Sequence, residues 1–319
     1  MIAKKTVAAF LFASLLRSTG FGDVDWRFVA AEQGATNVVI ASAAPGSPLE
    51  FSWRWSPYED PNVAKDAAAF AWVDECKMVD GGRTVLVCAS NGGAAAVDVA
   101  TRRARWYLKL APDTAGPHSL ELLPDGRVAV ACSVGIDKLV IVDVAKHPFD
   151  PSGQTAKEVM DLPGGHGVVW DSKRDSLFVL GYTNLFELAY RKETMSVDVK
   201  RKWDFSKAAA DARGHDLVAD GRGGYYMTNR TGVWSFNPDE GVFKPVMMRA
   251  HVKSYSPDGT KGVLVQVPTE KWWSDRLIVI EPDGGERIVG PYRGAKFYKA
   301  RWIKESSEKK DWKWAGTER

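Results

Sequence analysis

Short, β-branched apolar segments recur along the chain, each placed after a turn rich in Asp, Gly and Pro. The segments read TVLVCA, VAVACS, SLFVLG, YYMTN and GVLVQV, and the turns include Pro124-Asp125-Gly126 and Pro257-Asp258-Gly259. A variable loop follows each segment, then a third apolar stretch such as AAAVDV or LVIVDV, then a fourth such as ARWYLKL. Strands at this spacing, separated by turn signals, predict four-stranded antiparallel blades.

Four of the five histidines fall at one place in this repeat, at the start of its first strand. The copies begin HSLELLPDG at His118, HGVVWDSK at His166, HDLVADG at His215 and HVKSYSPDG at His251, and a fifth copy, DECKMVDGG, begins at Asp74. Self-similarity at about this period, roughly 40 residues, is typical of propellers and solenoids. Because each blade contributes one such residue, the pattern predicts a ring around the propeller axis.

The anchors, continued to Lys299, define five complete blades. The segment FYKARWI near the C-terminus then has no partner, while NVVIASAA and LEFSWRW near the N-terminus lack a first strand. Together they predict a sixth blade split between the termini, which would pair strands that would otherwise be exposed edges. We therefore expect an all-β, six-bladed propeller in which Phe297–Trp302 pairs with the segment around Val38–Ala41. Seven blades is the alternative, should Asp23–Arg54 hold an extra one.

The two ends of the chain lie outside the repeat. Residues 1–20 read as a secretory signal peptide: Lys4 and Lys5 precede an apolar run, Val7–Leu16, that is well short of the roughly 20 residues of a membrane span. This predicts a periplasmic or secreted protein with no membrane span in the mature chain. The propeller would occupy 21–303 and a charged tail 304–319. Within Pro57–Trp72, the Ala-rich run Ala64–Phe70 predicts a short helix over the entrance.

Composition removes some classes of partner. Apolar residues make up 45% of the chain, enough for a sizeable core, and the net charge is only +3, with basic and acidic residues interleaved. Nucleic-acid binding therefore has no support. Three cysteines, an odd number, argue against a disulfide framework.

The predicted ring shares a face of the propeller with the loops between second and third strands. These loops carry polar and aromatic candidates for binding a small molecule or an oligosaccharide: Asn91, Asn184, Asn229, Arg230, Trp272 and Trp273. A concave mouth with convergent polar groups is the usual ligand site. Two adjacent tryptophans in a loop cannot both point into the core, so one of them should be exposed, where its flat ring could stack on a sugar.

Converging imidazoles suit a divalent transition metal. The candidate ligands are His118, His166, His215, His251 and Asp74, for Mn, Zn, Fe or Ca; no organic cofactor is indicated. An open metal position could polarise a substrate oxygen or acidify a bound water. Candidate catalytic residues are Glu75, as a carboxylate ligand or base, Lys299, as a base or cationic contact, and His118 if it is not ligated. The alternative is that the histidines are structural, each hydrogen-bonded to a neighbouring blade.

The segments DECKMVD, PHSLELLPDGRVAVA, GGHGVVWD and GHDL, with the closing YKARW, resemble secreted bacterial propellers of the domain-of-unknown-function family 6528. The resemblance covers most of Val38–Ile303. It implies an exported β-propeller, commonly found in bacteria that degrade glycans, with no established activity. A histidine ring in a propeller mouth is also similar to that of oligogalacturonate lyases, in which histidines hold a divalent metal, although a shared fold does not fix function.

Two hypotheses follow from these observations. The first is an exported carbohydrate-active enzyme, a metal-dependent lyase or related sugar-modifying enzyme that binds an acidic or keto sugar and stabilises an enolate. The second is a non-catalytic carbohydrate- or protein-binding propeller, in which the same face binds its ligand through Trp272, Trp273, Arg230 and Asn229.

Overall fold

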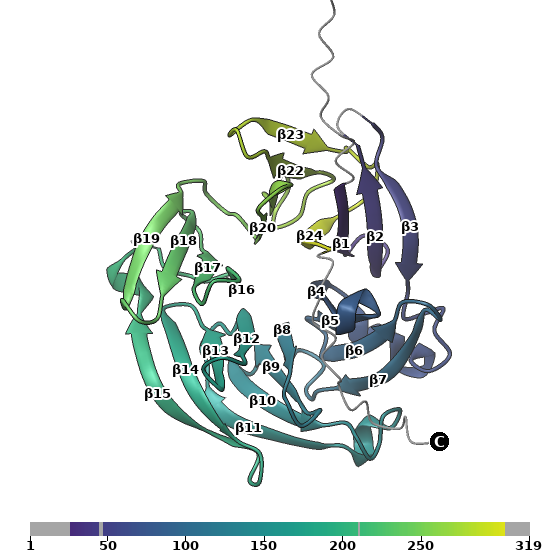
Figure 1. Ribbon diagram of the computed structural model, residues 1–319. Coiled ribbons are helices and arrows are strands. Elements are labelled where there is room, and N and C mark those ends of the chain that lie inside the picture. The colour runs from purple at the N-terminus through teal and green to yellow at the C-terminus, as the bar shows by residue number, and fades with distance from the viewer. Residues whose placement is uncertain (1–25, 45–46, 210, 304–319) are drawn as a thin grey trace, which may run out of the picture.

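The fold is known from a computed structural model, which describes residues 26–44, 47–209 and 211–303. The predicted signal peptide, 1–20, and the predicted tail, 304–319, lie outside these residues. The described chain forms six four-stranded antiparallel sheets arranged around a central axis (Figure 1). This confirms the all-β, six-bladed propeller.

Each blade runs from an innermost strand on the axis to an outermost strand at the rim. Blade 1 contains β4 (Val73–Val79), β5 (Thr84–Ala89), β6 (Gly93–Asp98) and β7 (Arg103–Lys109). Blade 2 contains β8 (Pro117–Leu122), β9 (Val128–Cys132), β10 (Lys138–Asp143) and β11 (Thr155–Asp161). Blade 3 contains β12 (Gly167–Asp171), β13 (Ser176–Leu180), β14 (Asn184–Arg191) and β15 (Ser196–Asp204).

The remaining blades follow the same order, except that the last one joins both ends of the chain. Blade 4 contains β16 (Asp216–Ala219), β17 (Tyr225–Thr228), β18 (Val233–Asn237) and β19 (Val242–Met247). Blade 5 contains β20 (Ser254–Asp258), β21 (Gly262–Gln266), β22 (Leu277–Ile280) and β23 (Glu286–Val289). Blade 6 contains β24 (Phe297–Trp302), β1 (Trp26–Glu32), β2 (Asn37–Ala43) and β3 (Glu50–Trp55).

Blade 6 confirms the predicted split but corrects its strand pairing. β24 pairs with β1, so that Phe28 lies opposite Trp302 and Ala30 opposite Ala300. The expected partner, the segment around Val38–Ala41, belongs to β2 and is one strand further from the axis. The sequence analysis missed β1, which supplies the second strand that the split blade needed. Since β24 occupies the innermost place, the first and last strands of the propeller are locked together.

The core lies between the blades. In β5, Val85 and Val87 pack towards blade 6, while Leu86 and Cys88 pack towards blade 2. Alternate side chains of a strand point to opposite faces of its sheet, and both faces of this strand are covered by neighbouring blades. That double burial explains why these strands are continuously apolar instead of alternating.

The described residues also form four short 3-10 helices: η1 (Ala64–Phe70), η2 (Asp80–Gly82), η3 (Pro151–Gly153) and η4 (Phe205–Lys207). η1 is the helix predicted from the Ala-rich run, and it packs against β5 and β6 of blade 1. None of the helices in the described segments has the length and apolar character that crossing a bilayer requires. All three cysteines are buried as free thiols.

Candidate functional site

The innermost strands of blades 1 to 5 each bring one polar residue to the axis, at or just before the start of the strand. We call the set formed by Asp74, His118, His166, His215 and Lys253 the axial ring. Asp74 and His118 each sit where the pairing of the first and second strands shifts register, between Val73 and Glu75 and between Pro117 and Ser119. Such bulges re-aim a side chain and are common beside functional sites.

Three of the four predicted histidines lie in contact. The ring centroids of His118 and His166 are 4.4 Å apart, and those of His166 and His215 are 5.3 Å apart. His118 Nδ1 lies 2.8 Å from the carbonyl oxygen of Gly116, and His166 Nδ1 lies 2.9 Å from that of Gly164. Because a carbonyl only accepts, each Nδ1 carries a proton, so in the neutral form of each ring the lone pair is on Nε2.

His251 does not join them, and Lys253 takes its place. The backbone amides of His166 and His215 donate to the last residue of the second strand in their blades, and the amide of Lys253 does the same in blade 5. His251 lies two residues earlier, exposed, with a left-handed φ of 64°. The repeat position predicted for blade 5 was therefore two residues too early, and His251 is not an axial residue.

His215 and Lys253 form a pair across neighbouring blades. The Lys253 Nζ lies 3.1 Å from His215 Nε2, and since an ammonium only donates, this imidazole accepts through Nε2. Its Nδ1 is then protonated, and it is buried without a hydrogen-bond partner. Burial lowers the pKa of Lys253 to about 8, helped by the positive charges of Arg230 and Lys299.

The buried imidazoles are held neutral. Burial, and then the neighbouring His118 and His215, lower the pKa of His166 well below its usual value. Burial, followed by Lys253 and Lys299, does the same for the pKa of His215. On the other side of the ring, burial raises the pKa of Asp74, which accepts hydrogen bonds from Gln33, at 3.1 Å, and from Ser90. The ring thus combines two neutral imidazoles with a carboxyl group whose pKa is raised.

Directly beneath the ring lies a buried network of four charges: Glu75, Asp216, Lys299 and Arg301. The Lys299 Nζ is 3.2 Å from Glu75 Oε2 and also donates to the carbonyl oxygens of His118 and His166, at 3.1 and 3.2 Å. Arg301 bridges the two carboxylates, with Nη2 3.0 Å from Glu75 Oε1 and Nη1 2.8 Å from Asp216 Oδ2.

This network changes the interpretation of two predicted catalytic residues. Lys299 is fully buried, and although burial lowers its pKa, Glu75 and Asp216 more than offset this and raise it. Burial would raise the pKa of Glu75, but Arg301 and Lys299 lower it to about 2. A lysine that stays protonated and a glutamate that stays ionised, each with its partners already bound, suit a structural role better than proton transfer. We therefore treat both as a brace between blades.

The predicted loop residues have different surroundings. Asn229 is fully buried, and its Oδ1 accepts from the backbone amides of Thr231 and Gly232, so it shapes its own turn. Asn91 donates to the carbonyl oxygen of Ala68 in η1, and Asn184 donates to Thr183. Arg230 is partly exposed and lies beside Asp211. Its charge lowers the pKa of both His215 and Lys253, so Arg230 lies close enough to act on the axial ring.

The two adjacent tryptophans divide as predicted: Trp272 is 40% exposed and Trp273 is 8% exposed. A third, Trp72, lies against both, with ring centroids 5.9 Å from Trp272 and 6.4 Å from Trp273. We call these three side chains the tryptophan cluster. Sequence reasoning missed Trp72, because a tryptophan gives no signal for the left-handed φ that this residue adopts.

A metal centre finds no support in these side chains. Among the described residues, no three His, Cys, Asp or Glu side chains are grouped so that they could hold a metal ion. Two of the predicted ligands are also engaged elsewhere, because His215 Nε2 accepts from Lys253 and Asp74 accepts from Gln33 and Ser90.

The fold and the ring together define a closed six-bladed β-propeller with a polar centre that combines neutral imidazoles with cationic groups. The chain belongs to a family of unknown function, DUF6528, whose model matches residues 23–313. This confirms the resemblance seen in the sequence. No curated protein matches the chain.

Solved structures show the same fold at low sequence identity. A protein of unknown function from Bacteroides caccae has a TM-score of 0.57 at 12% identity, covering 87% of this chain and 98% of that one. A Bacteroides fragilis protein, provisionally described as a 6-phosphogluconolactonase, has a TM-score of 0.53 at 12% identity, covering 84% and 80%. A chain of a nidogen–laminin complex has a TM-score of 0.54 at 11% identity, covering 88% and 99%. At these identities the likeness extends to the propeller fold alone.

Proposed function

We propose that this protein is an exported carbohydrate-active propeller that binds an acidic sugar at the axial ring and removes the proton beside its carboxylate. The observation that carries the proposal is one contact group formed by His118, the neutral imidazoles of His166 and His215, and Lys253, with the positive charge of Arg230 close by. Cations next to uncharged bases suit a substrate that is itself an anion and must lose a proton.

The carboxylate of the sugar would lie between Lys253 and Arg230. Lys253 is partly exposed, and its ammonium hydrogen-bonds only to the neutral His215 among the described residues, so it has further donors for a ligand. Charge-assisted hydrogen bonds to a carboxylate are among the stronger polar contacts. Electron density that develops on the carboxylate during proton abstraction would be stabilised by the same two cations.

Proton transfer would fall to His118 and His166. In each, Nδ1 donates to a backbone carbonyl, so the Nε2 lone pair of the neutral imidazole would be the base. After the C–H bond breaks, its electron pair forms a double bond to the neighbouring carbon as the C–O bond there breaks. The departing oxygen needs a proton, and Asp74, whose pKa is raised by burial, is the ring member suited to deliver it.

Export is the second part of the proposal, and it rests on the signal-peptide pattern of residues 1–20. A periplasmic or secreted location would place the propeller where acidic polysaccharides and their fragments are encountered. The proposal requires no organic cofactor.

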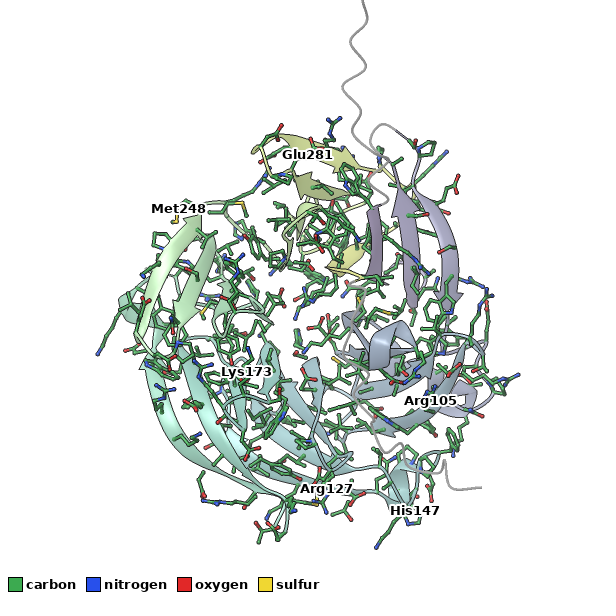
Figure 2. The ribbon with its side chains drawn as sticks, viewed as in Figure 1. Arg105, Arg127, His147, Lys173, Met248 and Glu281 are labelled. Atoms are coloured by element: carbon green, nitrogen blue, oxygen red, sulfur yellow. The ribbon has the colours of Figure 1, made fainter. Side chains whose placement is uncertain are left out.

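Incubation with a panel of uronate oligosaccharides tests the function, by following the ultraviolet absorbance of the conjugated product and the masses of the fragments. Turnover by the native protein, lost in a folded His118→Ala, His166→Ala double variant, is the expected result. His147→Ala is the matched control, because His147 is exposed at the outer rim of the propeller (Figure 2). No turnover of any uronate in the panel would overturn the enzymatic proposal.

A non-catalytic carbohydrate-binding propeller is the second candidate, and the exposed tryptophan cluster favours it. Trp72 and Trp272 present large aromatic surfaces to solvent, which proton transfer does not require. Calorimetric titration with the same panel separates the two candidates. Binding without turnover would identify a binding module.

A further inference from the structure

Trp72 is exposed and conformationally unusual. It is 42% exposed and has a φ of 61°, in the left-handed region that bulky residues rarely adopt. Strain of this kind persists where the surroundings hold the residue in place, and it is concentrated at functional sites. Trp72 directly precedes β4, the strand that carries Asp74, and its ring lies against Trp272 and Trp273.

Within the tryptophan cluster, the exposed rings of Trp72 and Trp272 pack against the buried ring of Trp273. Trp273 is buried and lies at 24° to Trp72, close to parallel, while Trp272 stands edge-on to both, at 67° to Trp72 and 89° to Trp273. Trp272 Nε1 donates to Gln33 Oε1 at 3.0 Å, which fixes the orientation of its ring. The rings that are open to solvent are therefore held by packing and a hydrogen bond, as a preorganised binding surface requires.

Gln33 joins this surface to the axial ring. Its Nε2 donates to Asp74 Oδ1 at 3.1 Å and to the carbonyl oxygen of Val73 at 3.2 Å. The side chain of Gln33 thus links Trp272 directly to Asp74. A molecule seated at the ring would have its next unit close to the tryptophans.

Two lysines give the cluster a positive charge. Lys296 Nζ lies 4.8 Å from the ring centroid of Trp273, and Lys271 Nζ lies 5.5 Å from the same centroid. A flat apolar face with cations beside it complements a sugar ring that carries a carboxylate. Neutral sugars would use the face but not the lysines.

We propose that Trp72 and Trp272 form a second sugar subsite, next to the axial ring, so that the ligand is an acidic oligosaccharide and not a single sugar. The inference rests on the proposed function for the first subsite at the ring. It assigns Trp72 and Trp272 to stacking, Gln33 to the junction between subsites, and Lys271 and Lys296 to the carboxylate of the second unit.

The test compares the affinities of galacturonic acid and its tetrasaccharide, and of glucuronic acid and its tetrasaccharide, by calorimetric titration. The native protein should bind at least one tetrasaccharide more tightly than its monosaccharide. In Trp72→Ala that advantage should fall by about threefold to tenfold, the order expected for a lost aromatic contact. Binding of the monosaccharide should be unchanged, because the axial ring is intact.

Two variants control for indirect effects. Trp72→Phe retains a flat ring and should restore part of the tetrasaccharide advantage, whereas Tyr58→Ala removes another exposed aromatic, 59% exposed, and should change nothing. A Trp72→Ala protein that keeps the full tetrasaccharide advantage overturns the subsite but leaves the proposed function standing. If neither monosaccharides nor tetrasaccharides bind, the proposed function and the subsite fail together.

Discussion

At the scale of single residues, three imidazoles from equivalent positions have different nitrogens available. His118 and His166 donate through Nδ1 to backbone carbonyls and keep Nε2 free, while His215 accepts through Nε2 from Lys253. A repeat in the sequence predicts that such residues meet on the axis. It does not predict which nitrogen is occupied, because that depends on the neighbouring blade.

Lys253 provides a prediction about pH. Its pKa is lowered from the ordinary 10.5 to about 8, first by burial and then by Arg230 and Lys299, while Asp74 opposes the shift. The ammonium that would bind a carboxylate is present below about pH 8 and is lost above it. Affinity for an acidic oligosaccharide should therefore fall as the pH rises through about 8, measured by titration at a series of pH values. Lys253→Arg should bind equally well on both sides of that pH, since arginine stays charged.

An unchanged pH profile in the Lys253→Arg variant would show that another group controls binding. The groups that face Lys253, namely His215, Arg230, Lys299 and Asp74, would then be the next to substitute.

The positions of His251 and Trp72 could not be predicted from the sequence, whereas the exposure of one of two adjacent tryptophans could. His251 was aligned with the other histidines because the letters matched, but hydrogen bonding to the second strand places Lys253 there. Trp72 was not identified because its exposure follows from a left-handed φ, and a tryptophan gives no signal for that conformation. The exposure of one of Trp272 and Trp273 was predictable, because neighbouring side chains in a loop cannot share one core.

At the scale of elements, β24 carries both the closing pairs of the propeller and two members of the charge network. Lys299 and Arg301 reach across the axis to Glu75 of β4 and Asp216 of β16. The strand therefore ties blade 6 to blades 1 and 4 as well as to β1. The repeat predicted that the termini would meet, but it could not show β1 between β24 and β2, because β1 contains no anchor residue.

The variant Lys299→Met tests whether Lys299 has a structural or a catalytic role. Removing one partner from a buried ion-pair network leaves uncompensated charge, so the free energy of unfolding should fall by roughly 3 to 5 kcal/mol. Lys253→Met, at the partly exposed edge of the ring, should cost far less, because its removal leaves no buried carboxylate unpaired. Urea unfolding of the two variants and the native protein measures the difference. If both variants lost the same small amount of unfolding free energy, Lys299 would again be a candidate base.

At the scale of the whole molecule, six blades close a circle whose centre is charged instead of apolar. The number of blades could be predicted because each repeats the same strands and turns, and the burial of both faces follows from the uniformly apolar second strands. The central network could not, because Glu75, Asp216, Lys299 and Arg301 come from three blades far apart in sequence. Their proximity exists only once the circle is closed.

The charge network at the centre of the closed propeller leads to a prediction about stability in acid. The pKa of Glu75 is lowered from 4.5 to about 2, because Arg301, Lys299 and Lys77 outweigh the effect of burial. A carboxyl group whose pKa is lower in the folded state stabilises that state above its unfolded pKa. The contribution is thus fully present above about pH 4.5 and is lost progressively as the pH falls towards about 2.

The free energy of unfolding of the native protein, measured in urea across that range, should fall more steeply with decreasing pH than that of Glu75→Gln. The variant should be less stable than the native protein at neutral pH, and the gap should narrow in acid as the native Glu75 takes up its proton. A gap that stays constant from neutral pH to about pH 2 would mean that Glu75 is not held ionised by β24, and that the closure of the propeller depends on apolar packing between blades alone.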